Sequence, residues 1–78
     1  MIQYGVILFH TTSSVMRAEK LLLKAGFNIK LVPTPREFSS DCGISIRFEW
    51  GKHEPINMLL EEEGVEFEAI YPLSKKNG

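Results

Sequence analysis

The only thiol of this 78-residue chain is Cys42, which lies in a Ser-Ser-Asp-Cys-Gly stretch. A cysteine reacts as the thiolate, and the pKa of a free thiol, about 8.5, falls beside a cation or a helix N-terminus. Gly43 permits backbone geometry that points amides at an anion, and Ser39 and Ser40 add hydroxyl donors. Asp41 opposes this, because an adjacent carboxylate disfavours a thiolate. Two interpretations stay open: a reactive thiol, or a small buried apolar residue.

Four further residues could form an anion site around Cys42. Thr34 and Arg36 lie in a proline-containing segment, and the guanidinium of Arg36 is a fork-shaped donor. The alternative is a loop held rigid by its prolines, with Arg36 in solvent. His10 and Arg17 supply positive charge if the fold brings them close.

The remaining chemistry is sparse. The two histidines are far apart in the predicted topology, and with one cysteine they do not make a metal site. No glycine-rich phosphate loop and no Ser-His-Asp spacing is present, so we expect no metal, no cofactor and no complete enzyme active site.

Six elements must position these residues. Apolar patterns predict strands at residues 2–9, 27–31, 44–50 and 65–71, and helices at 15–25 and 55–63. The order βαββαβ predicts an α+β, ferredoxin-like sandwich, in which a four-stranded antiparallel sheet carries both helices on one face. We expect a single ferredoxin-like domain over residues 1–73 and a flexible polar tail over 74–78.

This topology brings one end of the sheet together around Cys42. The first strand ends, the first helix begins, and the loop 33–43 lies at the same edge. His10 and the hydroxyls of Thr12 and Ser13 should therefore be neighbours of Cys42. We predict that Cys42 is solvent-accessible, close to the N-terminus of the first helix, and reactive.

The sheet face without helices is the predicted contact surface. We expect Ile7, Phe9 and Ile70 at its centre, and a homodimer through this open face is the simplest partner. The expected charged rim is Lys30, Arg47, Glu49, Glu66 and Glu68. The glutamates at 61–63 are interpreted as a solvated face that opposes the helix dipole.

Charge and hydropathy exclude several function classes. The net charge of -1 offers no basic field for nucleic acid. The longest apolar run, at residues 6–9, is far shorter than the roughly 20 residues of a membrane span. The N-terminus lacks the pattern of an export signal, and one cysteine allows no internal disulfide. We therefore expect a reduced, cytoplasmic protein.

Four motifs indicate a family. They are Met16-Arg17-Ala18-Glu19-Lys20-Leu21-Leu22, Leu31-Val32-Pro33-Thr34-Pro35-Arg36-Glu37, Ser39-Ser40-Asp41-Cys42-Gly43 and Ile46-Arg47-Phe48. With them the chain resembles the putative selenium/sulfur carrier protein-like family of short bacterial proteins or domains, over nearly its whole length. It departs from the family mainly at 51–55 and in the tail.

The resemblance implies a function for the motif. Cys42 would hold sulfur or selenium as a persulfide or perselenide, in a pocket shaped by Arg36, Ser39 and Ser40. Donor and acceptor proteins would be its partners. The competing interpretations are a non-catalytic ligand-binding or regulatory ferredoxin-like module, and a redox sensor that uses Cys42 across a dimer.

Overall fold

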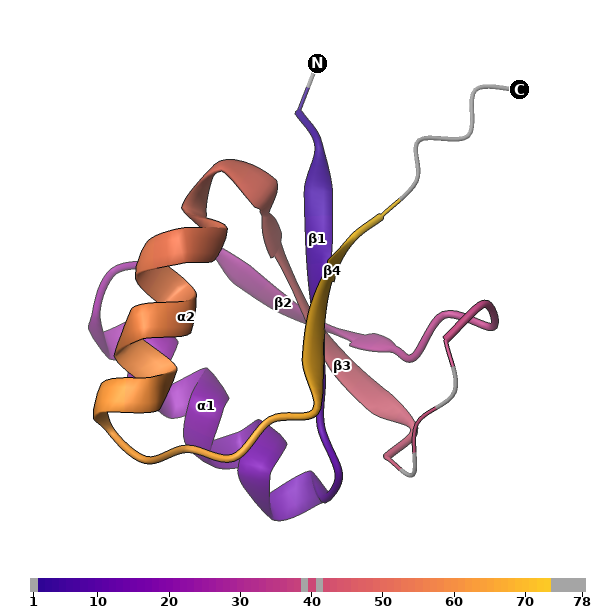
Figure 1. Cartoon of the computed structure of the whole chain (residues 1–78), viewed down its shortest axis with the longest axis horizontal. Coiled ribbons are helices and arrows are strands. Elements are labelled where there is room, and N and C mark those ends of the chain that lie inside the picture. Colours follow the sequence, from indigo (N-terminus) through magenta and orange to yellow (C-terminus); the bar gives the residue numbers. More distant parts are fainter. Residues whose placement is uncertain (1, 39, 41, 74–78) are drawn as a thin grey trace.

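Four strands form one antiparallel sheet in the computed structural model, which describes residues 2–38, 40 and 42–73. The elements are β1 (Tyr4–Leu8), α1 (Thr12–Lys24), β2 (Ile29–Pro33), β3 (Ile44–Glu49), the 3-10 helix η1 (Trp50–Lys52), α2 (His53–Glu62) and β4 (Ala69–Pro72). The strand order is β2-β3-β1-β4. Both helices lie on one side of the sheet (Figure 1). The predicted α+β, ferredoxin-like fold is confirmed, and the predicted tail, 74–78, lies outside the described residues.

Helix α1 begins at the predicted cluster of hydroxyl residues. Thr11 is its N-cap, and the Thr11 side-chain oxygen accepts a hydrogen bond from the Ser14 amide at 3.2 Å. Val15, Ala18 and Leu22 are buried on the face toward the sheet. Gly26 follows the helix with a φ of +92°, a left-handed conformation that costs glycine little.

The C-terminal half differs from the predicted boundaries. Residues 51–54, which lie between the predicted strand and the predicted helix, are helical: η1 runs directly into α2, which begins at His53 instead of Pro55. The His53 ring stacks on Trp50 with centroids 4.1 Å apart, which fixes this junction. The last strand begins at Ala69 instead of Val65. Val65 is buried in the core and its amide donates to the Leu60 carbonyl, so this segment completes the end of α2.

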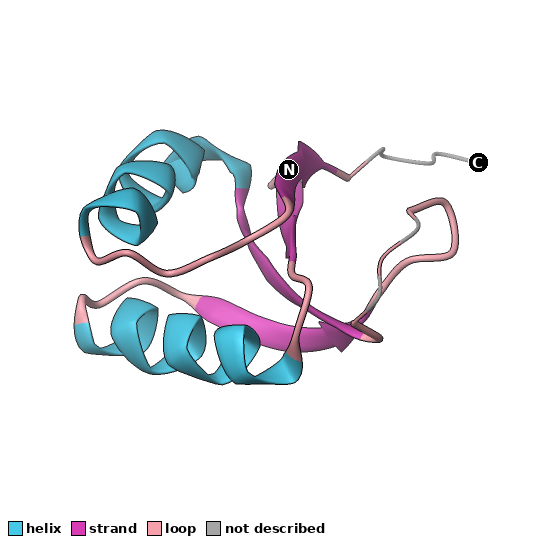
Figure 2. Ribbon diagram, turned by 60° about the horizontal axis from the view of Figure 1, so that its bottom comes forward, coloured by secondary structure: helices cyan, strands magenta, loops and turns pink. Residues whose placement is uncertain are grey.

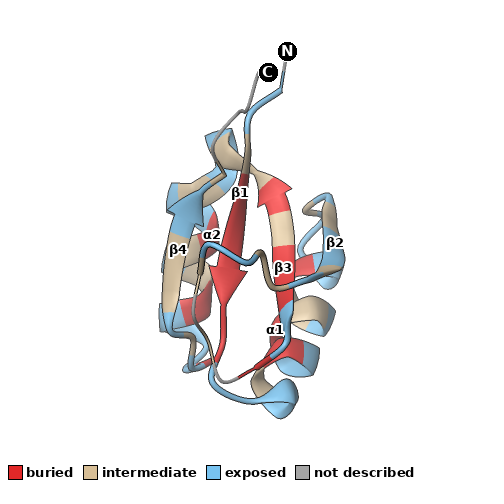
Figure 3. Ribbon diagram, turned by 90° about the vertical axis from the view of Figure 1, so that its right-hand side faces the viewer, coloured by how far each residue is buried: buried red, intermediate tan, exposed pale blue. Residues whose placement is uncertain are grey.

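The predicted contact surface at Ile7, Phe9 and Ile70 is wrong. Ile7 and Phe9 are fully buried among the residues that the helices cover, and Ile70 packs against the same core. In the sheet Ile7 lies opposite Ile46 of β3 and Ile70 of β4, so these three side chains share the helix face. The error has a simple cause: Val6 and Leu8 are also buried, so β1 has no polar residue to mark its outer face (Figure 3).

The face without helices is covered in part by the connection between β2 and β3. That connection lies on the side of the sheet opposite the helices (Figure 2). Phe38 stacks on Tyr71 of β4 with centroids 4.9 Å apart and an interplanar angle of 5°. Tyr71 is the register partner of Val6, which is fully buried. The Arg47 guanidinium lies 4.2 Å from the centre of the Tyr4 ring on the same face. This face is therefore partly closed by the chain's own side chains.

None of the helices within the described ranges has the length and apolar character needed to span a membrane.

Candidate functional site

Cys42 lies where the β2–β3 connection meets the start of α1. Its sulfur is 3.8 Å from the side-chain oxygen of Thr12, the first residue of that helix. The predicted proximity to the helix N-terminus is confirmed. The predicted solvent accessibility is wrong, since Cys42 is 5% exposed and belongs to the hydrophobic core. The cause is tertiary packing: Cys42 joins a core cluster whose other members come mainly from the strands and both helices.

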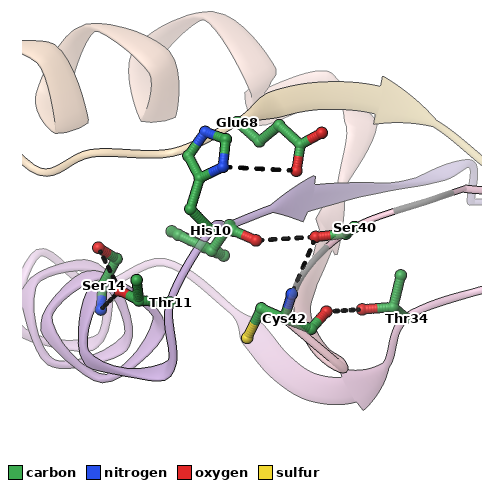
Figure 4. A network of polar contacts seen from close by, with 8 residues as sticks. His10, Thr11, Ser14, Thr34, Ser40, Cys42 and Glu68 are labelled. Atoms are coloured by element: carbon green, nitrogen blue, oxygen red, sulfur yellow. Dashed lines mark hydrogen bonds and ion pairs between the residues drawn. The ribbon is translucent and has the colours of Figure 1, made fainter.

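Hydroxyl groups hold the backbone around the thiol (Figure 4). The Cys42 amide donates to the Ser40 side-chain oxygen at 3.3 Å. The Ser40 hydroxyl in turn donates to the carbonyl of Phe9 at 2.8 Å. On the other side, the Thr34 hydroxyl donates to the Cys42 carbonyl at 2.9 Å, and the Thr34 amide donates to the carbonyl of Gly43. Both polar groups of the Cys42 backbone are thus satisfied. Its position is defined by residues that directly follow β1 and β2, Phe9 and Thr34.

A third hydroxyl, that of Ser45, supports this arrangement from within the sheet. The Ser45 and Thr34 side-chain oxygens are 2.8 Å apart, and Ser45 is fully buried. Because the single proton of the Thr34 hydroxyl is directed at the Cys42 carbonyl, Ser45 must donate to Thr34. Ser45 therefore donates to Thr34, and Thr34 donates to the Cys42 carbonyl. Both hydroxyl protons are used in hydrogen bonds.

Among the described residues, none of the predicted cations makes a hydrogen bond or ion pair with Cys42. The His10 Nδ1 is 4.0 Å from a carboxylate oxygen of Glu68, so its ring is turned toward the start of β4. Arg17 and Arg36 are exposed, and neither makes a hydrogen bond or salt bridge within the part of the chain that the structure describes. Ser39 and Asp41 lie outside the described residues. In the same part of the chain, no three His, Cys, Asp or Glu side chains are grouped so that they could hold a metal ion.

A shallow apolar depression adjoins the thiol-bearing segment. It has a volume of about 320 Å³ and is lined by Leu31, Val32, Pro33, Gly43 and Ile44. Leu31 and Ile44 are large apolar residues with 36% of their surface exposed. Gly43, which lines one side of this depression, directly follows Cys42 in the sequence.

The family comparison matches this site. A family model described as "Putative Se/S carrier protein-like" matches residues 4–72, which includes β1, both helices and the whole Cys42 region. The chain belongs to this family. The resemblance predicted from the four motifs is thereby confirmed. Searches of the curated proteins and of the solved structures return no match.

Three residues of this Se/S carrier-like protein complete the site but were not among the predicted site residues. The topology predicts the Thr12 hydroxyl only as a neighbour of Cys42, and in the structure this hydroxyl contacts the sulfur. Ser45 lies in the predicted third strand without a predicted role, and it is fully buried. Phe38 carries no reactive group and was not singled out. The signal for Thr12 was available, because the βαββαβ order places the first helix turn beside the loop.

Proposed function

We propose that this protein carries sulfur or selenium on Cys42, as a persulfide or perselenide, and passes it to a partner protein. The observation that carries the proposal is the single cysteine of a Se/S carrier-like chain in contact with the first residue of α1. Such a carrier needs one thiol and a surface for a partner, and no substrate-converting active site of its own.

The transfer step needs no external oxidant or reductant. The Cys42 thiolate attacks the outer sulfur of a donor persulfide, a new sulfur–sulfur bond forms on Cys42, and the donor thiolate leaves. One sulfur atom in the neutral oxidation state moves, and charge is conserved. An acceptor thiolate removes it by the same displacement in reverse. A selenium donor follows the same balance, with a sulfur–selenium bond on Cys42.

The surroundings of Cys42 suit a terminal anion. The N-terminus of a helix carries partial positive charge, so a negatively charged sulfur or selenium is favoured at the start of α1. The Thr12 hydroxyl can donate a hydrogen bond to that atom. We assign Ser40 and Thr34 the positioning of the Cys42 backbone. We assign Arg36, Ser39 and Asp41, from the same β2–β3 connection, the outer part of the pocket.

Transfer also places demands on the surroundings. Because Cys42 is 5% exposed, a protein-bound donor reaches the sulfur only after the segment around it shifts. The adjoining apolar depression at Leu31 and Ile44 supports contact with a protein rather than with a free small molecule. We place the protein in a reducing cytoplasmic compartment, where a carrier thiol is not lost to disulfide formation.

The burial of Cys42 favours one other function. If the thiol is a structural core residue, the domain is a non-catalytic ligand-binding or regulatory module. The two functions predict different masses for the native protein.

Mass spectrometry of protein purified without reductant tests the proposal. We expect a fraction of wild type to carry the added mass of one sulfur or selenium atom, which reductant removes. Incubation with inorganic polysulfide should raise that fraction, since the thiolate takes one sulfur and releases the shortened polysulfide. Cys42→Ser is the matched control and should carry no added mass. An unmodified wild type after polysulfide treatment would exclude the carrier and favour the ligand-binding module.

A further inference from the structure

The two helices carry opposite charge on surfaces that the carrier chemistry does not use. Helix α1 has three basic residues, Arg17, Lys20 and Lys24, against a single acidic one. Helix α2 has three glutamates and neither lysine nor arginine. All three cations are exposed, as are Glu54, Glu61 and Glu62. One side of the sheet therefore presents a basic helix and an acidic helix together (Figure 1).

Among the described residues, these charges form no ion pairs with one another. Within residues 2–38, 40 and 42–73, the one ion pair at salt-bridge distance is that between His10 and Glu68. A groove of about 270 Å³ runs beside α1, lined by Arg17, Lys20, Lys24 and Glu63 with Leu21 and Val65. The cations and the carboxylate border this groove without closing it.

The acidic end of α2 is electrostatically unfavourable within its own helix. Glu61 and Glu62 occupy its last turn and Glu63 is its C-cap, where negative charge opposes the helix dipole. Cations supplied from outside the protomer would offset the unfavourable interaction between these glutamates and the negative end of the helix dipole. Met58 lies between Glu54 and Glu61 on the same helix and is 65% exposed, the largest exposure among the described large apolar residues. On α1, Met16 and Leu23 are each about half exposed beside the cations.

We propose that the helix face binds a second copy of this chain, with α1 of each copy along α2 of the other. Because both helices lie on one side of the sheet, a single two-fold axis brings the basic helix onto the acidic helix twice. Met16, Leu23 and Met58 form the apolar contacts, and the charges form the surrounding polar pairs. An acidic partner protein would compensate only the positive charge of α1. A second copy compensates the positive charge of α1 and the negative charge of α2.

Charge reversal at matched positions tests this dimer. Wild type should sediment as a dimer in low salt at high micromolar concentration and dissociate as salt is raised, since exposed charges are screened. Lys20→Glu with Lys24→Glu should raise the dissociation constant about a hundredfold or more, because like charges then face each other. Glu61→Lys with Glu62→Lys should do the same, and an equimolar mixture of the two variants should form a heterodimer.

Two controls make the result specific. Lys30→Glu with Arg36→Glu changes the net charge equally at exposed residues away from the helices and should leave the dimer intact. Cys42→Ser should also dimerise, which excludes a disulfide-linked pair and keeps this test independent of the carrier proposal. Circular dichroism verifies that each variant is folded. A monomeric wild type, a dimer insensitive to the helix charges, or a failure of the two variants to pair would each overturn the proposal.

Discussion

At the end of the sheet where β1 stops, hydroxyl groups hold the chain, whereas aromatic rings fill the end where β1 begins. Around Cys42, the contacts are the hydrogen bonds of Ser40, Thr34 and Ser45. At the opposite end, the Phe48 ring packs against the Trp50 ring, which stacks in turn on the His53 ring. Hydrogen bonds exchange with water at a small net cost, whereas interlocked rings leave no room to shift. The thiol thus lies at the end of the molecule that can open more readily.

The largest effect should come from the aromatic end, at Gly5. A Cβ there would lie 2.5 Å from a Trp50 ring carbon and 2.8 Å from the Phe48 ring. Gly5→Val should therefore lower the free energy of unfolding by about 3 kcal/mol, measured by urea denaturation. Gly51→Ala is the control, because a Cβ at Gly51 meets nothing within 4 Å, and its effect should stay within about 0.5 kcal/mol. Equal stability of Gly5→Val and wild type would show that this end is loosely packed.

At the thiol end, Thr34→Val should have a smaller but clear effect. It removes the donor to the Cys42 carbonyl and the acceptor of the buried Ser45 hydroxyl. The expected loss is about 1–3 kcal/mol of unfolding free energy, the usual cost of unsatisfied buried polar groups. Thr34→Ser keeps the hydroxyl and should recover most of the loss. If valine is tolerated as well as serine, the hydroxyl chain does not stabilise this end.

Phe38→Ala should loosen the connection that carries Cys42. The Phe38–Tyr71 stack anchors this connection to β4, and such ring pairs contribute about 0.5–1.5 kcal/mol. We expect a comparable loss of stability and a severalfold faster alkylation of Cys42 in the folded protein. Tyr71→Ala should have the same effect, and the double variant should add little to either. Fully additive alkylation rates would mean that the two rings act separately.

The smallest effect on stability is expected at Arg36. This side chain is exposed, so Arg36→Ala should change the unfolding free energy by no more than about 0.5 kcal/mol. If Arg36 supports an anion at Cys42, the variant should nevertheless react more slowly with the neutral reagent iodoacetamide. Lys30→Ala removes an exposed cation at the other end of β2 and should leave the rate unchanged. Identical rates for both variants would remove Arg36 from the pocket.

The local patterns of the sequence were sufficient to predict the element order and the neighbourhood of the thiol. The hydroxyls before Val15, the stripe of buried positions and Gly26 define α1 from its own residues. Given βαββαβ, the right-handed crossovers leave one arrangement, and this arrangement brings Cys42 to the start of α1. The family was also predictable, because its motifs are contiguous in the chain.

Only the tertiary structure decided which way β1 faces and how deeply Cys42 is buried. Residues 6–9 are all apolar and all buried, so the period of two that orients a strand is absent from the sequence. The orientation of Ile7 and Phe9 depends on where the helices pack, and the cover over Val6 depends on how the β2–β3 connection folds back. The same packing encloses Cys42. These are contacts between segments distant in the chain, and no local pattern encodes them.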